Sequence, residues 1–433
     1  MEATLKNGVS SDDVRAIAEA AGEPEWLATW RHDAWDVWEQ TPLPDRVKHL
    51  WRYTDPEKFL IDKVTPVLPA AAGEAEDELP AGMQESPAGV GIVDDASLQT
   101  SWLAPEWREA GVVITDLATA ASTHEELVRE HLGRAVGPGA GKFEALNAAL
   151  FPGGVLVYVP CGVAVQGPIH LFRRHGIDLS AAFPRLLVVI DEGAEATIID
   201  EYSNPGDPRV VANAVVEGTV LPNGHLNYFN IQRWGSRTRS HARQRFLLQR
   251  DASASTVNIA LGGQYNKTDI ANIQQGENAQ SEMIGVTFGA GTQHFDTHTE
   301  HVHEASNSFS DMDFKVVLED EARSAYTGLI RIELDAANCE AYQENRNLML
   351  DPTCSAHSIP ELEILNEDVR CTHGATVGPI DPDQVYYLKT RGLPEREAEK
   401  LIVEGFFGPA LDRIEDEGLR DRLWGLIDDK IAD

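Results

Sequence analysis

A cysteine and a histidine lie two positions apart near the carboxyl end of the chain, at Cys371 and His373 in the stretch RCTHGATVG. On a β-strand this spacing places both side chains on one face, about 6.6–7 Å apart along the backbone. Thiolate and imidazole groups suit iron–sulfur clusters, zinc and copper. Two ligands cannot complete a metal site, so the others would have to come from elsewhere in this chain or from another chain.

The remaining cysteines add little to this pair. Cys354 and His357 could form a second pair, but they lie in the turn-like sequence DPTCSAHSIP, which implies no geometry. Cys161 and Cys339 are best interpreted as small buried residues. Whether Cys371 is a ligand, a sulfur relay or a neighbour of the histidine stays open at this point.

A second group of metal-binding residue types lies in HFDTHTEHVH, from His294 to His303. An extended segment would divide these side chains between two faces of one strand, with His294, Asp296, His298 and Glu300 on one and His301 and His303 on the other. They could form a two-histidine, one-carboxylate site or a cupin-like metal-dependent enzyme centre. The glycine and glutamate of the cupin motif are missing, because Phe295 and Asn307 stand at their positions. We favour a polar strand that faces solvent.

Composition narrows the class of protein. The chain has 433 residues, enough for two or three structural regions, and a net charge of −34, which opposes binding to nucleic acid. No apolar run is long enough to cross a membrane, and the amino terminus carries acids where a signal peptide needs an apolar core. Four irregularly spaced cysteines predict no disulfide framework. We therefore expect a cytoplasmic protein.

The elements that must position these residues change along the chain. Residues 1–66 predict helices, in which tryptophans at helical spacing indicate core packing. Residues 67–90 are rich in Ala, Gly, Glu and Pro and predict a flexible linker, and residues 91–150 give mixed signals. Residues 381–433 predict further helices, starting at Asp381-Pro382.

Between these helical regions, residues 151–380 show short β-type runs separated by turns. A weak repeat has equivalent points at intervals of 30, 28, 27 and 43 residues, at Ala194, Gly224, Ala252, Ala279 and Ala322. A strand-and-turn repeat near 28 residues predicts a β-solenoid. We expect a mainly β protein whose solenoid core has its open ends capped by the helical regions.

No P-loop, GxGxxG, CxxC, HExxH or GxSxG motif occurs, so common nucleotide-binding and hydrolytic activities have no support. Two long segments, GLIRIELDAANCEAYQENRNLML and ELEILNEDVRCTHGATVGPIDPDQVYYLKTRGLPEREAEKLIVEGFF, resemble the SufB/SufD family of iron–sulfur cluster assembly proteins. Segments such as EPEWLATWRHDAW, WRYTDPEKF and LGRAVGPGAGKFEALNAALFPGG extend the resemblance over nearly the whole chain. Within the family the chain resembles the SufD type, because His373-Gly374-Ala375 replaces the His-Glu-Ala of SufB-like chains and no cysteine precedes Cys161.

This resemblance implies a fold and a function. The family fold is a right-handed parallel β-helix between helical amino- and carboxy-terminal regions. The implied function is that of a non-catalytic scaffold subunit of a SufBCD complex, which forms a transient iron–sulfur cluster at the interface with a SufB-like subunit. His373 is the implied metal ligand, with Cys371 beside it, and residues 381–433 would dock a SufC-like ABC ATPase. A homodimeric scaffold remains an alternative, and flavin binding is expected on the other subunit.

Overall fold

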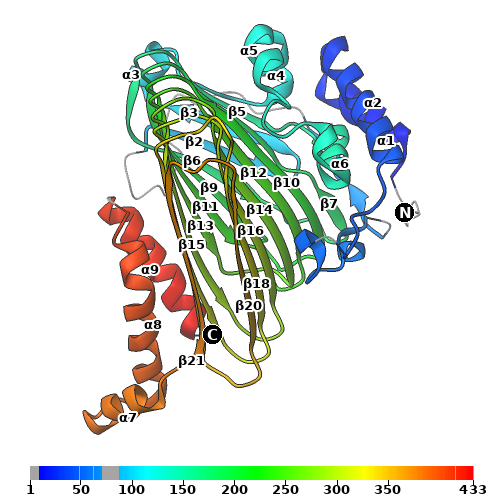
Figure 1. Ribbon diagram of the computed structural model, residues 1–433. Helices are drawn as coiled ribbons and strands as arrows, with labels where there is room; N and C mark the ends of the chain where they lie inside the picture. The colour runs from blue at the N-terminus through cyan, green and yellow to red at the C-terminus, as the bar shows by residue number, and fades with distance from the viewer. Residues whose placement is uncertain (1–8, 48, 62, 71–86, 415, 433) are drawn as a thin grey trace.

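The computed structural model describes residues 9–47, 49–61, 63–70, 87–414 and 416–432. Its core is a mainly parallel β-solenoid in which the chain alternates between an 11-stranded and a 10-stranded sheet, here called sheet A and sheet B (Figure 1). Consecutive strand pairs from β5–β6 to β20–β21 build about eight turns. The predicted solenoid with helices at both ends of the chain is confirmed.

Each turn contributes one strand to each sheet. The strands of sheet A are β1 (Thr65–Pro66), β4 (Val113–Thr115), β5 (Val155–Val159), β7 (Ser180–Ala182), β8 (Arg185–Ile190), β10 (Val210–Val220), β12 (Arg239–Leu248), β14 (Tyr265–Gln274), β16 (His294–His303), β18 (Arg323–Ile332) and β20 (Ser355–Ile364). Those of sheet B are β2 (Gly89–Asp94), β3 (Ser97–Leu103), β6 (Ala164–Arg174), β9 (Glu195–Ser203), β11 (His225–Arg233), β13 (Ser253–Ala260), β15 (Gln280–Gly289), β17 (Phe309–Leu318), β19 (Cys339–Met349) and β21 (Val369–Pro379).

The sequence repeat arises at the corner where the chain passes from sheet A to sheet B. A residue with left-handed backbone stands there in successive turns, followed by a small buried residue. The left-handed residues are Gly193, Asn223, Asp251, Asn278, Asn307 and Asn338, with φ between 56° and 64°. Glycine, asparagine and aspartate tolerate this conformation best, which explains the period.

One predicted point of the repeat is wrong. Strand register aligns Ala194, Gly224, Ala252 and Ala279 as predicted, but the next equivalent residue is Ser308. Ala322 instead precedes β18 at the opposite corner, where the chain passes from sheet B to sheet A. Ala322 resembles a member of the repeat because it is also a small, fully buried residue after a turn.

The amino-terminal helices cover the outer face of sheet A. They are α1 (Ser11–Ala21), α2 (Glu25–Gln40), α4 (Leu117–Thr123), α5 (Glu125–His131) and α6 (Lys142–Leu150), with the 3₁₀ helices η1 (His49–Trp51), η2 (Pro56–Phe59) and η3 (Pro138–Ala140). The capping box of Ser10 and Asp13 starts α1, and Gly22 ends it with φ 64°. The predicted tryptophan stripe is confirmed as packing, since Trp35 is buried in a hydrophobic cluster and Trp26, Trp30 and Trp38 pack against the same cluster.

The carboxy-terminal helices lie elsewhere than predicted. These are α7 (Pro382–Thr390), α8 (Glu395–Leu411) and α9 (Glu417–Ala432). Helices α8 and α9 pack along the outer face of sheet B, where Val403 and Phe407 join a cluster with Ile231 and Val257 (Figure 1). They leave the carboxy-terminal end of the solenoid uncovered, so the expectation that they cap it is wrong. The apolar residues on the outer face of sheet B are the surface that these helices bury.

Antiparallel strands close the other end of the solenoid. β3 pairs with β2 in sheet B, and β4 pairs with β5 in sheet A. The short helix α3 (Pro105–Glu109) connects β3 to β4, with Trp107 packed against the interior cluster. Strands rather than helices therefore protect this edge.

The predicted linker at 67–90 falls largely outside the described residues, at 71–86, and its last two residues begin β2. No helix in the described part of the chain is long and apolar enough to cross a membrane.

Candidate functional site

Cys371 and His373 lie on β21, the last strand of sheet B. Register pairs Cys371 with Ala341 and His373 with Gln343 of β19. Ala341 and Gln343 are buried between the two sheets, so Cys371 and His373 occupy positions that face the interior. Because β21 pairs with β19 and with no other strand in the described part of the chain, these inward positions lie at the mouth of the solenoid.

The two side chains differ in their surroundings. Cys371 is half-buried against a cluster that contains Cys339 and Tyr326, whereas His373 is exposed. Burial, with a smaller effect of the neighbouring Cys339, raises the pKa of the Cys371 thiol. A thiol with a raised pKa is protonated at neutral pH and must lose its proton to bind metal. The His373 side chain is exposed and therefore accessible from outside the chain, so its expected role as the leading ligand stays a prediction.

Apolar residues surround the mouth. Ile364 of β20 aligns with the buried Ile332, and Val377 of β21 aligns with the buried Asn347, so both occupy inward positions. Both are nevertheless exposed, because no further turn covers them. This apolar rim was not predicted from the sequence, where ELEIL reads as an ordinary alternating strand.

Cys354 and His357 do not form a second ligand pair. Cys354 packs inward beside Leu318 and Ala322, at the opposite end of the last turn from the cluster that holds Cys371. His357 is exposed on the outer face and stacks on Tyr53, with 4.7 Å between ring centroids. Three residues of separation on a strand place the two side chains on opposite faces.

The prediction for the other two cysteines is half right. Cys339 is buried, as predicted, with its thiol 3.2 Å from the Ser308 hydroxyl. Cys161 is exposed, because it lies in the turn between β5 and β6 rather than on a strand.

The polar residues of β16 divide between two faces as predicted, but they are not solvated. On the outer face, Asp296 accepts hydrogen bonds from Thr54 at 2.5 Å and Lys267 at 2.9 Å. His298 Nδ1 lies 2.6 Å from Asp269. The amino-terminal segment around Thr54 covers this strand, which is why the prediction of a solvent-facing strand is wrong.

Asp269 is the centre of this outer network. Burial acts to raise its pKa, but the Arg243 guanidinium, His298 and Lys267 together hold the pKa well below its usual range. The carboxylate is therefore ionised and paired at all physiological pH values. Arg243 also pairs with Glu144 of α6 at 3.4 Å, which connects this network to the helices over sheet A.

On the inner face of β16, His301 and His303 point between the sheets. His301 Nε2 lies 2.8 Å from the Ser281 hydroxyl, and both nitrogens of His303 contact hydroxyls, of Ser308 and Ser310. Burial lowers the pKa of His303 to about 4, so it stays neutral. Among the described residues, no group of three or more His, Cys, Asp or Glu side chains could hold a metal ion. The cupin-like interpretation of this strand therefore has no ligand set.

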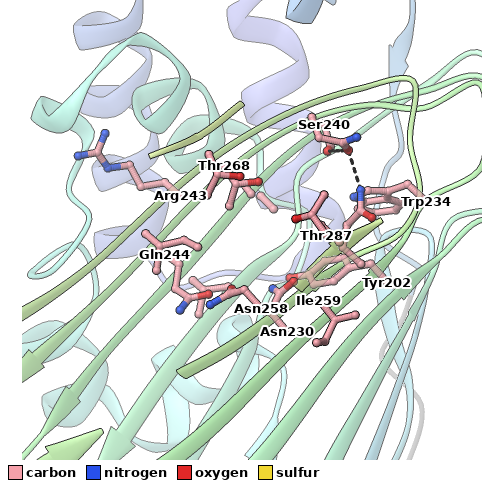
Figure 2. A pocket seen from close by; sticks show the side chains of 18 of the residues that line it. Tyr202, Asn230, Trp234, Ser240, Arg243, Gln244, Asn258, Ile259, Thr268 and Thr287 are labelled. Carbon is pink, nitrogen blue, oxygen red and sulfur yellow. Dashed lines mark hydrogen bonds between the residues drawn. The ribbon is translucent and has the colours of Figure 1, made fainter. Parts of the chain in front are cut away.

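A cavity of about 50 Å³ lies inside the solenoid, lined from both sheets (Figure 2). Gln244, Asn258 and Asn230 line it, whereas Arg243 points away from them (Figure 2). The amide nitrogens of Gln244 and Asn258 are buried without a hydrogen-bond partner. A cavity of this size holds a few water molecules rather than a cofactor.

Comparisons with known proteins agree with this architecture. Residues 81–171 match the model of the SufBD protein N-terminal region, and residues 172–406 match the SufBD core domain of SUF-system FeS cluster assembly. The iron–sulfur cluster assembly protein SufD of Bacillus subtilis is 29% identical over 98% of this chain and 99% of its own. SufB of the same organism is 25% identical over 93% and 89%, respectively. The chain therefore belongs to the SufBD family of iron–sulfur cluster assembly proteins, with a SufD-type sequence.

Proposed function

We propose that the open end of the solenoid is half of a site at which an iron–sulfur cluster is assembled, and that a SufB-like subunit supplies the other half. The cluster is the cargo of this site rather than a resident cofactor. The observation that carries the proposal is the inward position of Cys371 and His373 on the last strand, which in the described part of the chain pairs along one edge only. Few ligands from each chain suit a cluster that must later be released.

The apolar rim at the open end supports the proposal that a partner subunit binds there. Ile364 and Val377 belong to strands whose second edges are unpaired among the described residues, so another chain can continue both sheets and bury the rim. Uncovered strand edges with apolar side chains favour association with a further β-structure. In the proposed complex this chain is a non-catalytic, cytoplasmic scaffold.

The exposed surface of the carboxy-terminal helices supports the proposal of a second contact, with an ATPase subunit. Tyr386 and Tyr387 of α7 and Leu401 of α8 are exposed, although α8 and α9 are anchored to sheet B. Arg413 forms ion pairs with Glu282 and Asp311, which fix the end of α8. We propose that this anchored helical surface docks the SufC-like ATPase, so that movement of the ATPase is transmitted to the solenoid.

The variant His373→Ala tests the cluster site. The full chain is co-expressed with its SufB-like and SufC-like partners, and cluster formation is followed by visible absorption and by iron and sulfide content. We expect the cluster to be lost while the melting temperature stays unchanged, because His373 is exposed and its removal alters stability by less than ~0.5 kcal/mol.

Two further variants sharpen this test. His225→Ala removes another exposed strand histidine and should leave the cluster intact. His373→Cys keeps a metal-binding side chain and should restore part of the cluster. Full cluster content in His373→Ala would refute the proposed site. A complex that contains two copies of this chain and no SufB-like subunit would show that a homodimer completes the site instead.

A further inference from the structure

A pocket of about 600 Å³ opens beside the amino-terminal edge of sheet A, away from the open end of the solenoid. One wall comes from η2 and the residues that follow it, and the other from the starts of β10 and β12 and the loops before them. The lining residues are Glu57, Leu60, Lys63, Val64, Leu179, Arg209, Val210, Val211, Arg237, Arg239 and Gln264. Its size is that of a small-molecule site.

The charge of this pocket is opposite to that of the protein. The whole chain has 70 acidic and 36 basic residues. The pocket has four basic side chains, Lys63, Arg209, Arg237 and Arg239, and one acidic side chain, Glu57. A cationic concavity on so acidic a chain concentrates small anions locally, because the nearest charges dominate within a Debye length.

Contacts with neighbouring residues hold the guanidinium groups in place. Arg209 donates to Asp178 through its backbone N–H at 2.7 Å and its side chain at 3.2 Å. Arg237 lies one turn away and approaches the same carboxylate at 3.8 Å. Arg239 donates to the Gln264 side chain at 3.2 Å. Groups that are already ordered lose less conformational entropy when a ligand binds.

Two of the four cations keep their charge unpaired. In the described part of the chain, neither Lys63 nor Arg239 forms an ion pair, although Arg239 lies over the Tyr265 ring at 5.8 Å. Hydrogen bonds from Arg209 lower the pKa of Asp178 to about 2, so this carboxylate is charged and competes with any anion for Arg209 and Arg237. Counting only described residues, the four basic side chains outnumber Glu57 and Asp178, so the pocket keeps a net positive charge.

We propose that this pocket binds a small polyanion that carries two or more phosphate groups. Guanidinium forks match phosphate oxygens in bidentate geometry, and a lysine adds a mobile point charge. A single phosphate fills only a small part of a pocket of about 600 Å³, whereas a chain of phosphates fills more of it and reaches more of its cations. The site lies on the outer face of sheet A and is independent of the cluster-assembly site.

Calorimetric titration of the full chain with inorganic pyrophosphate tests the proposal. In 50 mM salt we expect saturable binding that is tighter than that of inorganic phosphate and that weakens at 150 mM salt. The variant Lys63→Gln/Arg239→Gln should weaken binding at least tenfold, because both unpaired cations are lost. The single variant Lys63→Gln, whose side chain is exposed, should weaken it several-fold without altering the fold.

A matched control distinguishes binding in the pocket from general attraction of anions to basic side chains. Arg129→Gln/Arg174→Gln removes two ion-paired arginines that are 49% and 46% exposed, on other surfaces, and should leave binding unchanged. Asp178→Asn removes the competing carboxylate and should tighten binding two- to fivefold. The proposal is overturned if pyrophosphate does not bind, if phosphate binds equally well, if the control weakens binding as much, or if Asp178→Asn weakens it.

Discussion

The proposed pairing with a SufB-type subunit should depend on the apolar rim at the open end. Ile364 of β20 is 40% exposed and Val377 of β21 is 44% exposed, although both occupy inward positions. The double variant Ile364→Ser/Val377→Ser removes apolar surface from the proposed contact. Because both residues belong to the last turn, the turns beneath keep their packing and the variant should fold.

The size of the effect follows from the exposed fractions. Complete burial of a valine or isoleucine side chain contributes about 1.5–3 kcal/mol. Together the two residues leave slightly less than one whole side chain exposed, so burying them contributes about 1.3–2.5 kcal/mol to association. At 1.4 kcal/mol per tenfold change, the Kd of the variant should rise about 10- to 60-fold.

Calorimetry or sedimentation with the SufB-type subunit of the same genome measures this Kd. The control is Leu68→Ser/Ile177→Ser, which removes two apolar side chains that are 50% and 44% exposed on other surfaces. An increase confined to the rim variant supports the interface. A Kd within twofold of the unsubstituted chain, or an equal loss in the control, would refute the assignment of the open end as the interface.

Two further predictions concern stability. Asp269→Asn should lower the free energy of unfolding by about 3 kcal/mol, since the largely covered Arg243 loses a carboxylate at 3.0 Å, whereas exposed Asp94→Asn should cost less than ~1 kcal/mol. Denaturant midpoints compare them, and equal losses would contradict the buried network. Burial lowers the pKa of His241 and His303 to about 4, so below pH 6.5 only the unfolded chain takes up these protons. Stability should be complete above that pH and fall by about 1–2 kcal/mol per histidine by pH 5; a His303→Gln variant with an unchanged pH dependence would disprove this cause.

The solenoid could be predicted from sequence because its period has a local cause. Left-handed corner residues such as Asn223 and Asp251 are followed by small residues such as Gly224 and Ala252, and both preferences are visible in one sequence. The predicted repeat fails at Ser308, because a serine stands there in place of the alanine or glycine of the earlier turns. The position of Cys371 and His373 at the boundary between the strands and the helical tail was also visible locally.

Features that depend on contacts between distant segments could not be predicted. The burial of β16 depends on Thr54, which lies 242 residues from Asp296. The position of α8 depends on outward-facing apolar residues in several turns of sheet B, and local patterns do not say which surface a helix will cover. The apolar rim at Ile364 could not be predicted because it is exposed only where no further turn stacks on β20 and β21, which end the two sheets in the described part of the chain.

The open end also sets how the site moves. In a solenoid each turn is stabilised by its neighbours, and the last turn has a neighbour on one side only. The strand that carries Cys371 and His373 should therefore open at a lower free energy than the interior strands, and its amide hydrogens should exchange fastest within sheet B. In the proposed complex, binding of the partner would order this strand, and its dissociation would loosen the strand together with the two proposed ligands. Cluster assembly would then require the folded last strand, and cluster release would accompany its local unfolding.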